Sequence, residues 1–300
     1  MSLVEKALEK LRVERSGNGP IAAPATESAV LATPPADLRV EQSAVGRARG
    51  APFMAMAGSL AKLTVPAEDP AWLAWSLKGN PMLQSQLRAL RREIGQALGP
   101  ATAAGNAQIV VVTSALPGEG KTFVSLALAR ALAADKGRRV VLIDGDLPMR
   151  QMTRMFGLLD KPGLSESIST GSEISGNLHL TEIDGLTFLP AGLYTPEAAD
   201  DMSGSRFDSL LGILRAAGPE FCFVIDSAPM LAAGETVYVA SRSDLTVMVV
   251  RADQTPRGAV AEALRKLGPA AKVGLLLNGQ QTTRIDHYYG YSETYGQHQT

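Results

Sequence analysis

Apolar residues follow two alternating patterns along this chain. Short continuous runs, such as Ile109–Val112 and Val140–Ile143, have the length and composition of strands that are buried on both faces. The segments between them repeat apolar residues every three or four positions, which is typical of amphipathic helices. Strands are expected at 109–112, 140–143, 186–192, 221–226, 245–252 and 272–279, and helices at 81–97, from 123 onward, and at 205–216, 234–242 and 256–267.

The alternation of strands with helices predicts the fold class. Parallel neighbours in a sheet need a crossover between them, and that crossover is usually a helix. The pattern therefore predicts an α/β fold, with a mostly parallel sheet and helices on both faces. In such sheets ligands bind beyond the carboxyl ends of the strands, so functional side chains are expected where the strands end.

The two ends of the chain depart from this pattern and set the expected domain boundaries. Residues 1–15 are amphipathic and predict a short helix, either a frayed terminus or a docking helix for a partner. Residues 16–80 are rich in Ala and Pro and predict a disordered linker. The predicted domain covers residues 81–281, and a flexible tyrosine-rich tail covers residues 282–300.

Composition limits the kinds of partner and the cellular compartment that we expect, but it does not indicate a function. The chain has 300 residues and a formal net charge of -1, so overall charge favours neither nucleic acid nor an anionic membrane as a partner. Its single cysteine, Cys222, excludes an internal disulfide, which fits a reducing cytoplasm. The N-terminus lacks the apolar core of a signal peptide, and no uncharged apolar stretch approaches about 18 residues. We expect a soluble protein that another component must hold at any membrane.

The segment between the first strand and the next helix carries a nucleotide-binding signature. Ala115–Thr122 reads as a Walker A phosphate loop in which Ala115 takes the place of the usual first glycine. Gly118 and Gly120 permit the backbone angles that turn successive N–H groups toward phosphate oxygens, and the helix N-terminus adds a favourable dipole. This signature predicts a P-loop NTPase-like fold. The residues expected at the nucleotide are Ala115, Pro117, Gly118, Glu119, Gly120, Lys121, Thr122 and Phe123.

Three aspartates follow predicted strands and are expected to face this loop. Asp226 ends an apolar run and suits the Walker B role, in which a carboxylate contacts Mg²⁺ directly or through water. Asp144 and Asp146 would face opposite sides of an extended chain, unless the strand ends between them, as Gly145 permits. One could then approach the metal and the other an attacking nucleophile. The predicted metal ligands are Thr122, Asp144 and Asp226, and the predicted catalytic residues are Lys121, Asp144 and Asp146.

The C-terminal tail holds four of the six tyrosines of the chain, Tyr288, Tyr289, Tyr291 and Tyr295. Tyrosines are usually at least half-buried, and four of them are hard to bury on a terminus rich in Gly, Ser and Gln. They form either an aromatic patch on a protein surface or a set of phenol nucleophiles offered to an ATP site. Four phosphotyrosines would add roughly -6 to -8 of charge to one end of the molecule.

These motifs together resemble the bacterial tyrosine autokinases of polysaccharide synthesis, the BY-kinases. The similar features are the phosphate loop, the Asp144-x-Asp146 pair, the Asp-Ser-Ala-Pro run at 226–229 and the tyrosine cluster. Segments 163–165 and 189–192 and the strand end at Asn278 match as well, and the first dozen residues look like the opening of the exosortase-associated members.

The resemblance implies a function, partners and a location. It implies Mg²⁺- and ATP-dependent phosphorylation of the tail tyrosines, between the subunits of a ring-shaped homo-oligomer, with Asn278 at the adenine. It further implies a membrane-embedded chain-length-determinant (polysaccharide co-polymerase) adaptor that recruits the kinase to the inner membrane face, and a tyrosine phosphatase that reverses the modification. Exopolysaccharide synthesis or export would be the regulated process.

The sequence also departs from the family pattern and leaves two other functions open. Ser85 stands where the ring-forming helix usually has a glutamate, and the basic residues expected after Asp146 are reduced and shifted to Arg150.

A positioning ATPase of the cell-division-site or plasmid-partition type would share the fold. Such proteins usually carry a second lysine early in the phosphate loop, which Ser114–Pro117 lacks. A nucleotide-binding regulator without kinase activity is the other alternative.

Overall fold

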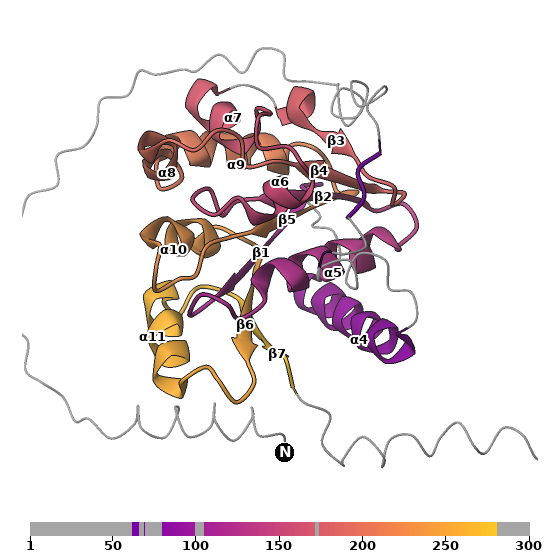
Figure 1. Cartoon of the computed structure of the whole chain (residues 1–300), viewed down its shortest axis with the longest axis vertical. Helices are drawn as coiled ribbons and strands as arrows, with labels where there is room; N and C mark the ends of the chain where they lie inside the picture. The colour runs from indigo at the N-terminus through magenta and orange to yellow at the C-terminus, as the bar shows by residue number, and fades with distance from the viewer. Residues whose placement is uncertain (1–61, 66–68, 70–79, 100–104, 172–173, 281–300) are drawn as a thin grey trace, which may run out of the picture. The chain divides into compact units, whose positions relative to one another are not determined.

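The computed structural model of this chain describes residues 62–65, 69, 80–99, 105–171 and 174–280 (Figure 1). The predicted N-terminal helix, most of the predicted linker and the tail with its four tyrosines lie outside these residues. The folded domain is therefore described from Asn80 to Gln280, apart from residues 100–104 and 172–173, together with a short segment around Leu63.

A sheet of seven strands forms the centre of the domain, in the order β3-β4-β2-β5-β1-β6-β7. All neighbouring strands are parallel except β3 and β4, which pair antiparallel. This arrangement confirms the mostly parallel α/β sheet that the apolar runs predict. The strands are β1 (Gln108–Ser114), β2 (Arg139–Asp144), β3 (His179–Leu180), β4 (Leu186–Leu189), β5 (Phe221–Asp226), β6 (Leu245–Arg251) and β7 (Val273–Asn278).

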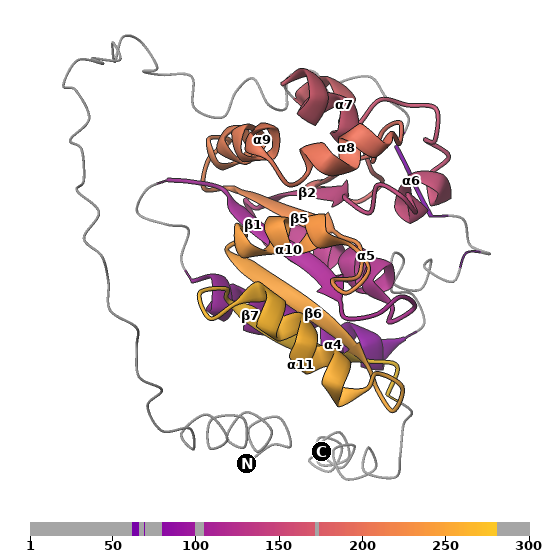
Figure 2. The same cartoon turned by 90° about the vertical axis from the view of Figure 1, so that its left-hand side faces the viewer.

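Helices cover both faces of this sheet, as Figures 1 and 2 show from two sides. One face packs against α7 (Leu164–Thr170), α8 (Pro196–Asp201), α9 (Ser205–Arg215), α10 (Gly234–Ser241) and α11 (Arg257–Leu267). The other face packs against α4 (Pro81–Leu98), α5 (Lys121–Ala133) and α6 (Gln151–Met155). A short 3₁₀ turn, η1 (Ile174–Asn177), belongs to the first layer. Two apolar cores result, one on each face of the sheet.

The central helix α5 shows why the sequence folds this way around the phosphate loop. It is apolar on nearly all sides because it lies between the sheet and α4, and Leu126, Leu128 and Leu132 are fully buried. Each such leucine stabilises the fold by about 1.5–3 kcal/mol. Helix α4 presents Leu87 and Ile94 to this layer, which confirms the apolar face predicted for 81–97. The N-terminus of α5 is thereby fixed at the end of β1.

Between β2 and α9, the sequence pattern predicted only β4 and missed the other short elements. Helices α6, α7 and α8 have 5, 7 and 6 residues, and β3 has 2. A helical period of 3.6 residues does not establish itself over one or two turns, so periodicity cannot reveal them. The strand expected at 186–192 also ends early, at Leu189, because the chain then turns toward α7 and α8.

One part of the predicted linker contacts the domain. Leu63 donates its N–H to the Leu180 carbonyl at 2.9 Å and accepts the Glu182 N–H at 2.9 Å, forming a bridge at the β3 edge of the sheet. Val65 is buried with only 2% of its surface exposed. Residues 62–65 lie within the predicted linker, and Leu63 adds one bridge to the β3 edge of the sheet. Among the described residues, no helix is both long and apolar enough to cross a membrane.

Candidate active site

The phosphate loop connects the end of β1 to the start of α5, as the sequence predicts. Gly118 and Gly120 adopt positive φ angles of 81° and 91°, in the left-handed region that glycine occupies at low cost. A Cβ at Gly120 would also lie 2.2 Å from the amide nitrogen of Asn278. Asn278, at the end of β7, donates its side-chain N–H to the Glu119 carbonyl at 3.0 Å. The residue that the resemblance places at the adenine therefore borders the phosphate loop.

The carboxylate of Glu119 holds this loop in shape. It is 3% exposed, accepts the Leu116 N–H at 2.9 Å and accepts the hydroxyl of Thr255 from the segment after β6. Arg251 donates to the Gly118 carbonyl at 3.1 Å from the same side. The sequence predicts Glu119 at the nucleotide, but its carboxylate is already hydrogen-bonded to other groups of the protein. A contact with phosphate would have to come from its backbone N–H group.

The other loop residues differ in their exposure. Ala115 is fully buried, and its carbonyl accepts the Leu231 N–H at 3.3 Å, so it anchors the loop to the segment after β5. Pro117 and Gly118 are exposed. Phe123 is half-buried and packs against the α5 core. Its ring therefore has a structural role, and its position in the first turn of α5 places only its backbone near the loop.

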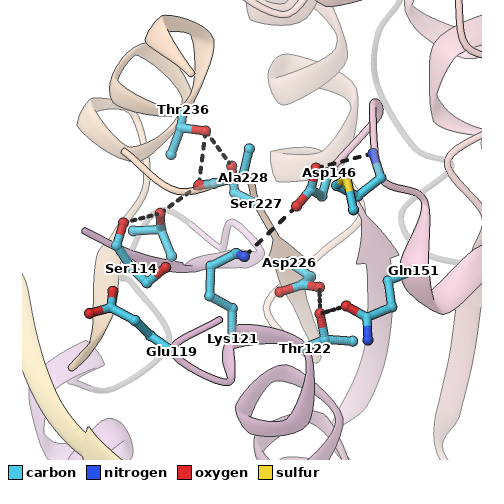
Figure 3. Close-up of polar contacts among 12 residues, drawn as sticks. Ser114, Glu119, Lys121, Thr122, Asp146, Gln151, Asp226, Ser227, Ala228 and Thr236 are labelled. Atoms are coloured by element: carbon cyan, nitrogen blue, oxygen red, sulfur yellow. Dashed lines mark hydrogen bonds and ion pairs between the residues drawn. The ribbon is translucent and has the colours of Figure 1, made fainter. Parts of the chain in front are cut away.

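Lys121 and Asp146 face each other across the site, as Figure 3 shows. The Lys121 Nζ lies 3.8 Å from Asp146 Oδ2, and the two residues are 9% and 6% exposed. Burial raises the pKa of Asp146 above its ordinary value, and the nearby Lys121 opposes that shift. This pair places a cation and a carboxylate together at the mouth of the phosphate loop.

Asp226, at the end of β5, receives two hydroxyl groups from the first two turns of α5. Thr122 donates to its Oδ2 at 2.9 Å (Figure 3). Ser125 donates to its Oδ1 at 2.8 Å. Burial raises the pKa of Asp226 to about 6, while Lys121 and the two hydroxyls oppose the shift. The pairing of Thr122 with Asp226 is the arrangement expected of a Walker A hydroxyl and a Walker B carboxylate.

Asp144 and Asp146 come to one site because β2 ends between them. Gly145 turns the chain by donating its N–H to the Asp226 carbonyl at 2.7 Å, and a Cβ there would lie 2.8 Å from Ile225 and 2.9 Å from that carbonyl. A strand end at Gly145 is the condition that the sequence sets for both carboxylates to share a cleft. The structure meets that condition.

Asp144 is fully buried and only half satisfied. Its Oδ2 accepts both the N–H and the hydroxyl of Thr153, each at 2.8 Å. Its Oδ1 has no hydrogen-bond partner among the described residues. Burial and the neighbouring Asp226 raise the pKa of Asp144 to about 7, and the Thr153 bonds oppose that shift. A buried carboxylate oxygen without a partner fits a water molecule or a cation at this point.

The turn after Asp146 completes the site. The Asp146 carbonyl accepts the Arg150 N–H at 2.7 Å, and Arg150 has a left-handed backbone with a φ of 46°. Gln151, the next residue, receives the Thr122 hydroxyl at 3.4 Å through its Oε1 (Figure 3). The segment that follows β2 thus lies across the N-terminus of α5.

The site as a whole contains most of the predicted residues and several unpredicted ones. The phosphate loop, Lys121, Thr122, the three aspartates and Asn278 lie together, whereas the four tail tyrosines lie outside the described residues. Ser125 could have been found, because it lies one helical turn after Thr122. Thr153 and Gln151 carry no signal in the sequence, because only the turn of the chain after β2 brings them here.

The donor set fits Mg²⁺ bound together with a phosphate group. No cluster of three or more His, Cys, Asp or Glu in the described part of the chain could hold a metal alone. Magnesium does not need such a cluster, because it is usually bound through one or two carboxylates, substrate phosphates and water. Thr122 Oγ1, Asp226 Oδ2 and the unpaired Asp144 Oδ1 are oxygen donors of this kind.

A glycine-containing loop between a buried strand and a helix N-terminus, with carboxylates at neighbouring strand ends, defines a P-loop nucleotide-binding protein. The family model described as the CobQ/CobB/MinD/ParA nucleotide binding domain matches residues 110–266. The chain belongs to this family.

Named relatives of the chain include tyrosine-protein kinases. It is 30% identical over 240 residues to the putative tyrosine-protein kinase EpsB of Ralstonia solanacearum, a match that covers 79% of this chain and 30% of EpsB. It is 28% identical over 195 residues to the tyrosine-protein kinase CpsD of Streptococcus pneumoniae, covering 63% of this chain and 84% of CpsD. The chain thus spans less than a third of EpsB.

A solved structure with a similar fold is the BceF tyrosine kinase domain. It superimposes with a TM-score of 0.58 and 30% sequence identity, over 69% of this chain and 81% of that one. The fold found in a known tyrosine kinase domain is therefore present here.

Proposed function

We propose that this protein is an ATP-dependent protein-tyrosine kinase that phosphorylates Tyr288, Tyr289, Tyr291 and Tyr295 of its own sequence. The observation that carries the proposal is the Asp146 carboxylate, held 3.8 Å from the phosphate-loop lysine at the mouth of the site. A nucleotide-binding protein that transfers phosphate to a hydroxyl needs a base at this point. The names of the EpsB and CpsD relatives support the same activity.

The residues divide the reaction between them. The phosphate loop and Lys121 hold the phosphates of ATP, and Lys121 offsets negative charge that develops as the γ-phosphoryl group leaves. Mg²⁺, when bound, neutralises the phosphates and orients the γ-phosphoryl group. Thr122 and Asp226 would hold that ion, together with Asp144 through its unpaired oxygen.

Asp146 is the residue best placed to activate the acceptor. A tyrosine hydroxyl attacks the γ-phosphorus, the bond to the β-phosphate oxygen breaks, and ADP leaves. The phenolic proton passes to the Asp146 carboxylate, whose pKa is raised by burial. A raised pKa makes a carboxylate a stronger base near neutral pH. Asp144 is less suited to this step, since Thr153 occupies one of its oxygens and its side chain is fully buried.

The proposed setting follows from the family resemblance. The kinase would work beneath a membrane-embedded chain-length-determinant protein, as a homo-oligomer in which tails reach neighbouring sites, with a tyrosine phosphatase in opposition. Its phosphorylation state would regulate exopolysaccharide synthesis or export. Phosphorylation changes the charge of the tail by roughly -1.5 to -2 per tyrosine, which is large against a net charge of -1.

The decisive experiment incubates the full chain with Mg²⁺ and ATP, alone and with a candidate adaptor, and maps phosphotyrosine by mass spectrometry. Phosphate on Tyr288–Tyr295 is expected from the wild type and not from Lys121→Met. Lys266→Met is the matched control, because Lys266 is an exposed lysine on α11. ATP hydrolysis without phosphotyrosine under either condition would reject the kinase in favour of a positioning ATPase. Nucleotide binding with neither product would indicate a regulator.

A further inference from the structure

Exposed apolar side chains gather beside the candidate active site. Met149 is 60% exposed, Leu193 is 53% exposed and Tyr194 is 42% exposed. Together they account for half of the large apolar side chains that are exposed in the described part of the chain. Apolar groups that stay exposed next to a site often mark a surface that receives a partner. We call these three residues the apolar rim.

Met149 is presented by the tight turn that follows Asp146. The Asp146 carbonyl accepts the Met149 N–H at 3.1 Å and the Arg150 N–H at 2.7 Å. Asp146 Oδ1 lies 3.4 Å from the same Met149 N–H. The exposed thioether therefore stands three residues from the proposed catalytic base, on a turn whose backbone is hydrogen-bonded to that residue.

Leu193 and Tyr194 are presented by the loop between β4 and α8, which is also firmly held. Leu193 donates its N–H to Glu166 Oε1 at 2.9 Å, and its carbonyl accepts the Ser165 hydroxyl at 2.8 Å. Thr195 then caps α8 by accepting the Ala198 N–H at 3.2 Å. The exposure of Leu193 and Tyr194 is thus a property of an ordered loop.

Hydrogen bonds join this loop to the segment after β2. Arg150 donates to the Gly192 carbonyl at 3.4 Å, one residue from Met149 on one side and one residue from Leu193 on the other. Thr153 accepts the Ala191 N–H at 2.8 Å while its hydroxyl donates to Asp144. The two parts of the apolar rim therefore flank one site, and that site contains Asp146.

We propose that the apolar rim is the docking surface for the segment 282–300 of this sequence, which presents its tyrosines to Asp146. An acceptor ring would pack against the Met149 thioether and the Tyr194 ring, contacts that aromatic side chains favour. Its hydroxyl would then lie at the Asp146 carboxylate. The proposal rests on the kinase function and adds the residues that select the acceptor.

The sequence and the end of β7 both favour this occupant. The segment 282–300 has four tyrosines and only three residues that are ionised at neutral pH, Arg284, Asp286 and Glu293, so an apolar and aromatic surface suits it better than a charged one. It begins shortly after Asn278, whose amide contacts the phosphate loop. Tyr288 lies ten residues beyond Asn278 and can extend at most about 35 Å from it.

The test measures phosphorylation of a synthetic 282–300 peptide by the full chain at saturating ATP. The double variant Met149→Ser, Tyr194→Ser is expected to raise the KM for the peptide about tenfold, the loss of one well-buried apolar contact. Its kcat and its KM for ATP should stay at wild-type values. Met82→Ser is the matched control, because Met82 is a methionine that is 48% exposed on α4. An unchanged KM for the peptide would overturn the proposal.

Two further variants separate docking from other effects. Tyr194→Phe keeps the ring and should keep the wild-type KM, while Tyr194→Ser alone should raise it. If Tyr194→Phe and Tyr194→Ser raise the KM for the peptide equally, the Tyr194 hydroxyl and not its ring is responsible, and the proposed packing is wrong. A fall in thermal stability or in ATP affinity that parallels the KM change would also count against docking.

A binding measurement keeps this proposal distinct from the kinase function. Fluorescence anisotropy of a labelled 282–300 peptide is followed with the full chain and Mg²⁺-ADP. If the wild type transfers no phosphate, the proposed function fails, yet weaker peptide binding by the double variant would still support the docking surface. If phosphate is transferred but the double variant binds the peptide as the wild type does, the docking surface fails alone.

Discussion

Two halves of the site meet at the ends of β2 and β5, and they are built differently. The nucleotide half consists of the phosphate loop, the first turn of α5 and Asp226. The acceptor half consists of Asp144, the segment 146–153 and the loop at 190–195. In the nucleotide half both oxygens of Asp226 accept hydroxyl groups. In the acceptor half Asp144 has one oxygen without a partner, and Arg150 has a buried Nε without a partner, among the described residues.

The difference shows which half is complete without ligands. The nucleotide half is built from one contiguous segment, the phosphate loop with the first turn of α5, and from the adjacent end of β5 at Asp226. The acceptor half depends on contacts between segments about 40 residues apart, such as Thr153 with Ala191 and Arg150 with Gly192. Its polar groups remain partly unsatisfied, which is costly for a protein interior unless another group enters. We infer that the nucleotide half is preformed and that the acceptor half is completed by ligands.

The largest effect is expected from removing the charge of the nucleotide half. Asp226→Asn should lower phosphotyrosine formation by about 10²–10³-fold, because a group that holds the metal against the transferring phosphate is lost. The fold should persist, since asparagine can still accept a hydroxyl. Phosphotyrosine is quantified at several Mg²⁺ concentrations. Asp160→Asn is the control, because the Asp160 side chain is 75% exposed. Unchanged Mg²⁺ dependence in Asp226→Asn would remove Asp226 from the metal site.

The acceptor half should be disrupted by a single methyl group. In Gly163→Ala the new Cβ would lie 2.0 Å from the Pro190 carbonyl oxygen and 2.6 Å from the Gly192 nitrogen, both of which are backbone atoms. The loop at 190–195 must then shift, and we expect the free energy of unfolding to fall by about 3 kcal/mol. Chemical denaturation measures this change.

The matched control for that variant is Gly176→Ala, where no atom lies within 4 Å of the new methyl group. In the surviving folded Gly163→Ala protein, tyrosine phosphorylation should decrease while ATP affinity is retained. Loss of ATP affinity together with phosphorylation would show that the two halves are not separable.

These two halves also mark what the sequence could predict. The nucleotide half was predictable because its phosphate-binding residues are contiguous, Ala115–Thr122. In addition, an apolar run predicts the strand that ends at Asp226. Gly145 was predictable for the same reason, since a strand end between Asp144 and Asp146 needs a residue that can turn. The sheet and its longer helices followed from hydrophobic period alone.

Asp144 and Asp146 were predictable, but the rest of the acceptor half was not, because its residues are placed by tertiary contacts. Thr153 lies in a helix of 5 residues, too short to produce a period. Glu166 supports Leu193 across 27 residues of intervening chain, a relation that no local pattern contains. Residues 62–65 resemble a linker in sequence because four residues cannot show the alternation of a strand, although Leu63 pairs with the β3 edge.

A pH series in the absence of Mg²⁺ should reveal the cost of ionising the two buried aspartates of the site. Asp144 and Asp226 have pKa values raised to about 7 and about 6, mainly by burial. Both lie above the value of about 3.9 for an unfolded aspartate, so the folded state binds more protons between these limits. Stability contributed by these groups is present at low pH and is lost by a few kcal/mol as the pH rises from about 4 to about 7.

The control for this series is Asp144→Asn, which removes the group with the larger shift. Its stability should decline less than that of the wild type between pH 5 and pH 7.5, as measured by urea denaturation. Mg²⁺ with nucleotide should stabilise the wild type more at pH 7.5 than at pH 5, because a cation binds the ionised carboxylates. Parallel pH profiles for wild type and variant would contradict the assignment of the unsatisfied charge to the acceptor half.

The smallest effects are expected from two substitutions that each remove one buried hydroxyl, one in each half of the site. Thr153→Val removes a hydroxyl that donates to Asp144 and accepts the Ala191 N–H, leaving a buried N–H without its partner. Ser125→Ala removes a hydroxyl that only donates to Asp226, which keeps its bond from Thr122. We expect losses of about 2 kcal/mol for Thr153→Val and about 1 kcal/mol for Ser125→Ala in denaturant unfolding.

Because Thr153 joins three segments, its loss should also weaken docking of the 282–300 peptide, whereas Ser125→Ala should leave that docking unchanged. Equal effects of the two variants on stability and docking would mean that the two halves are held together in the same way.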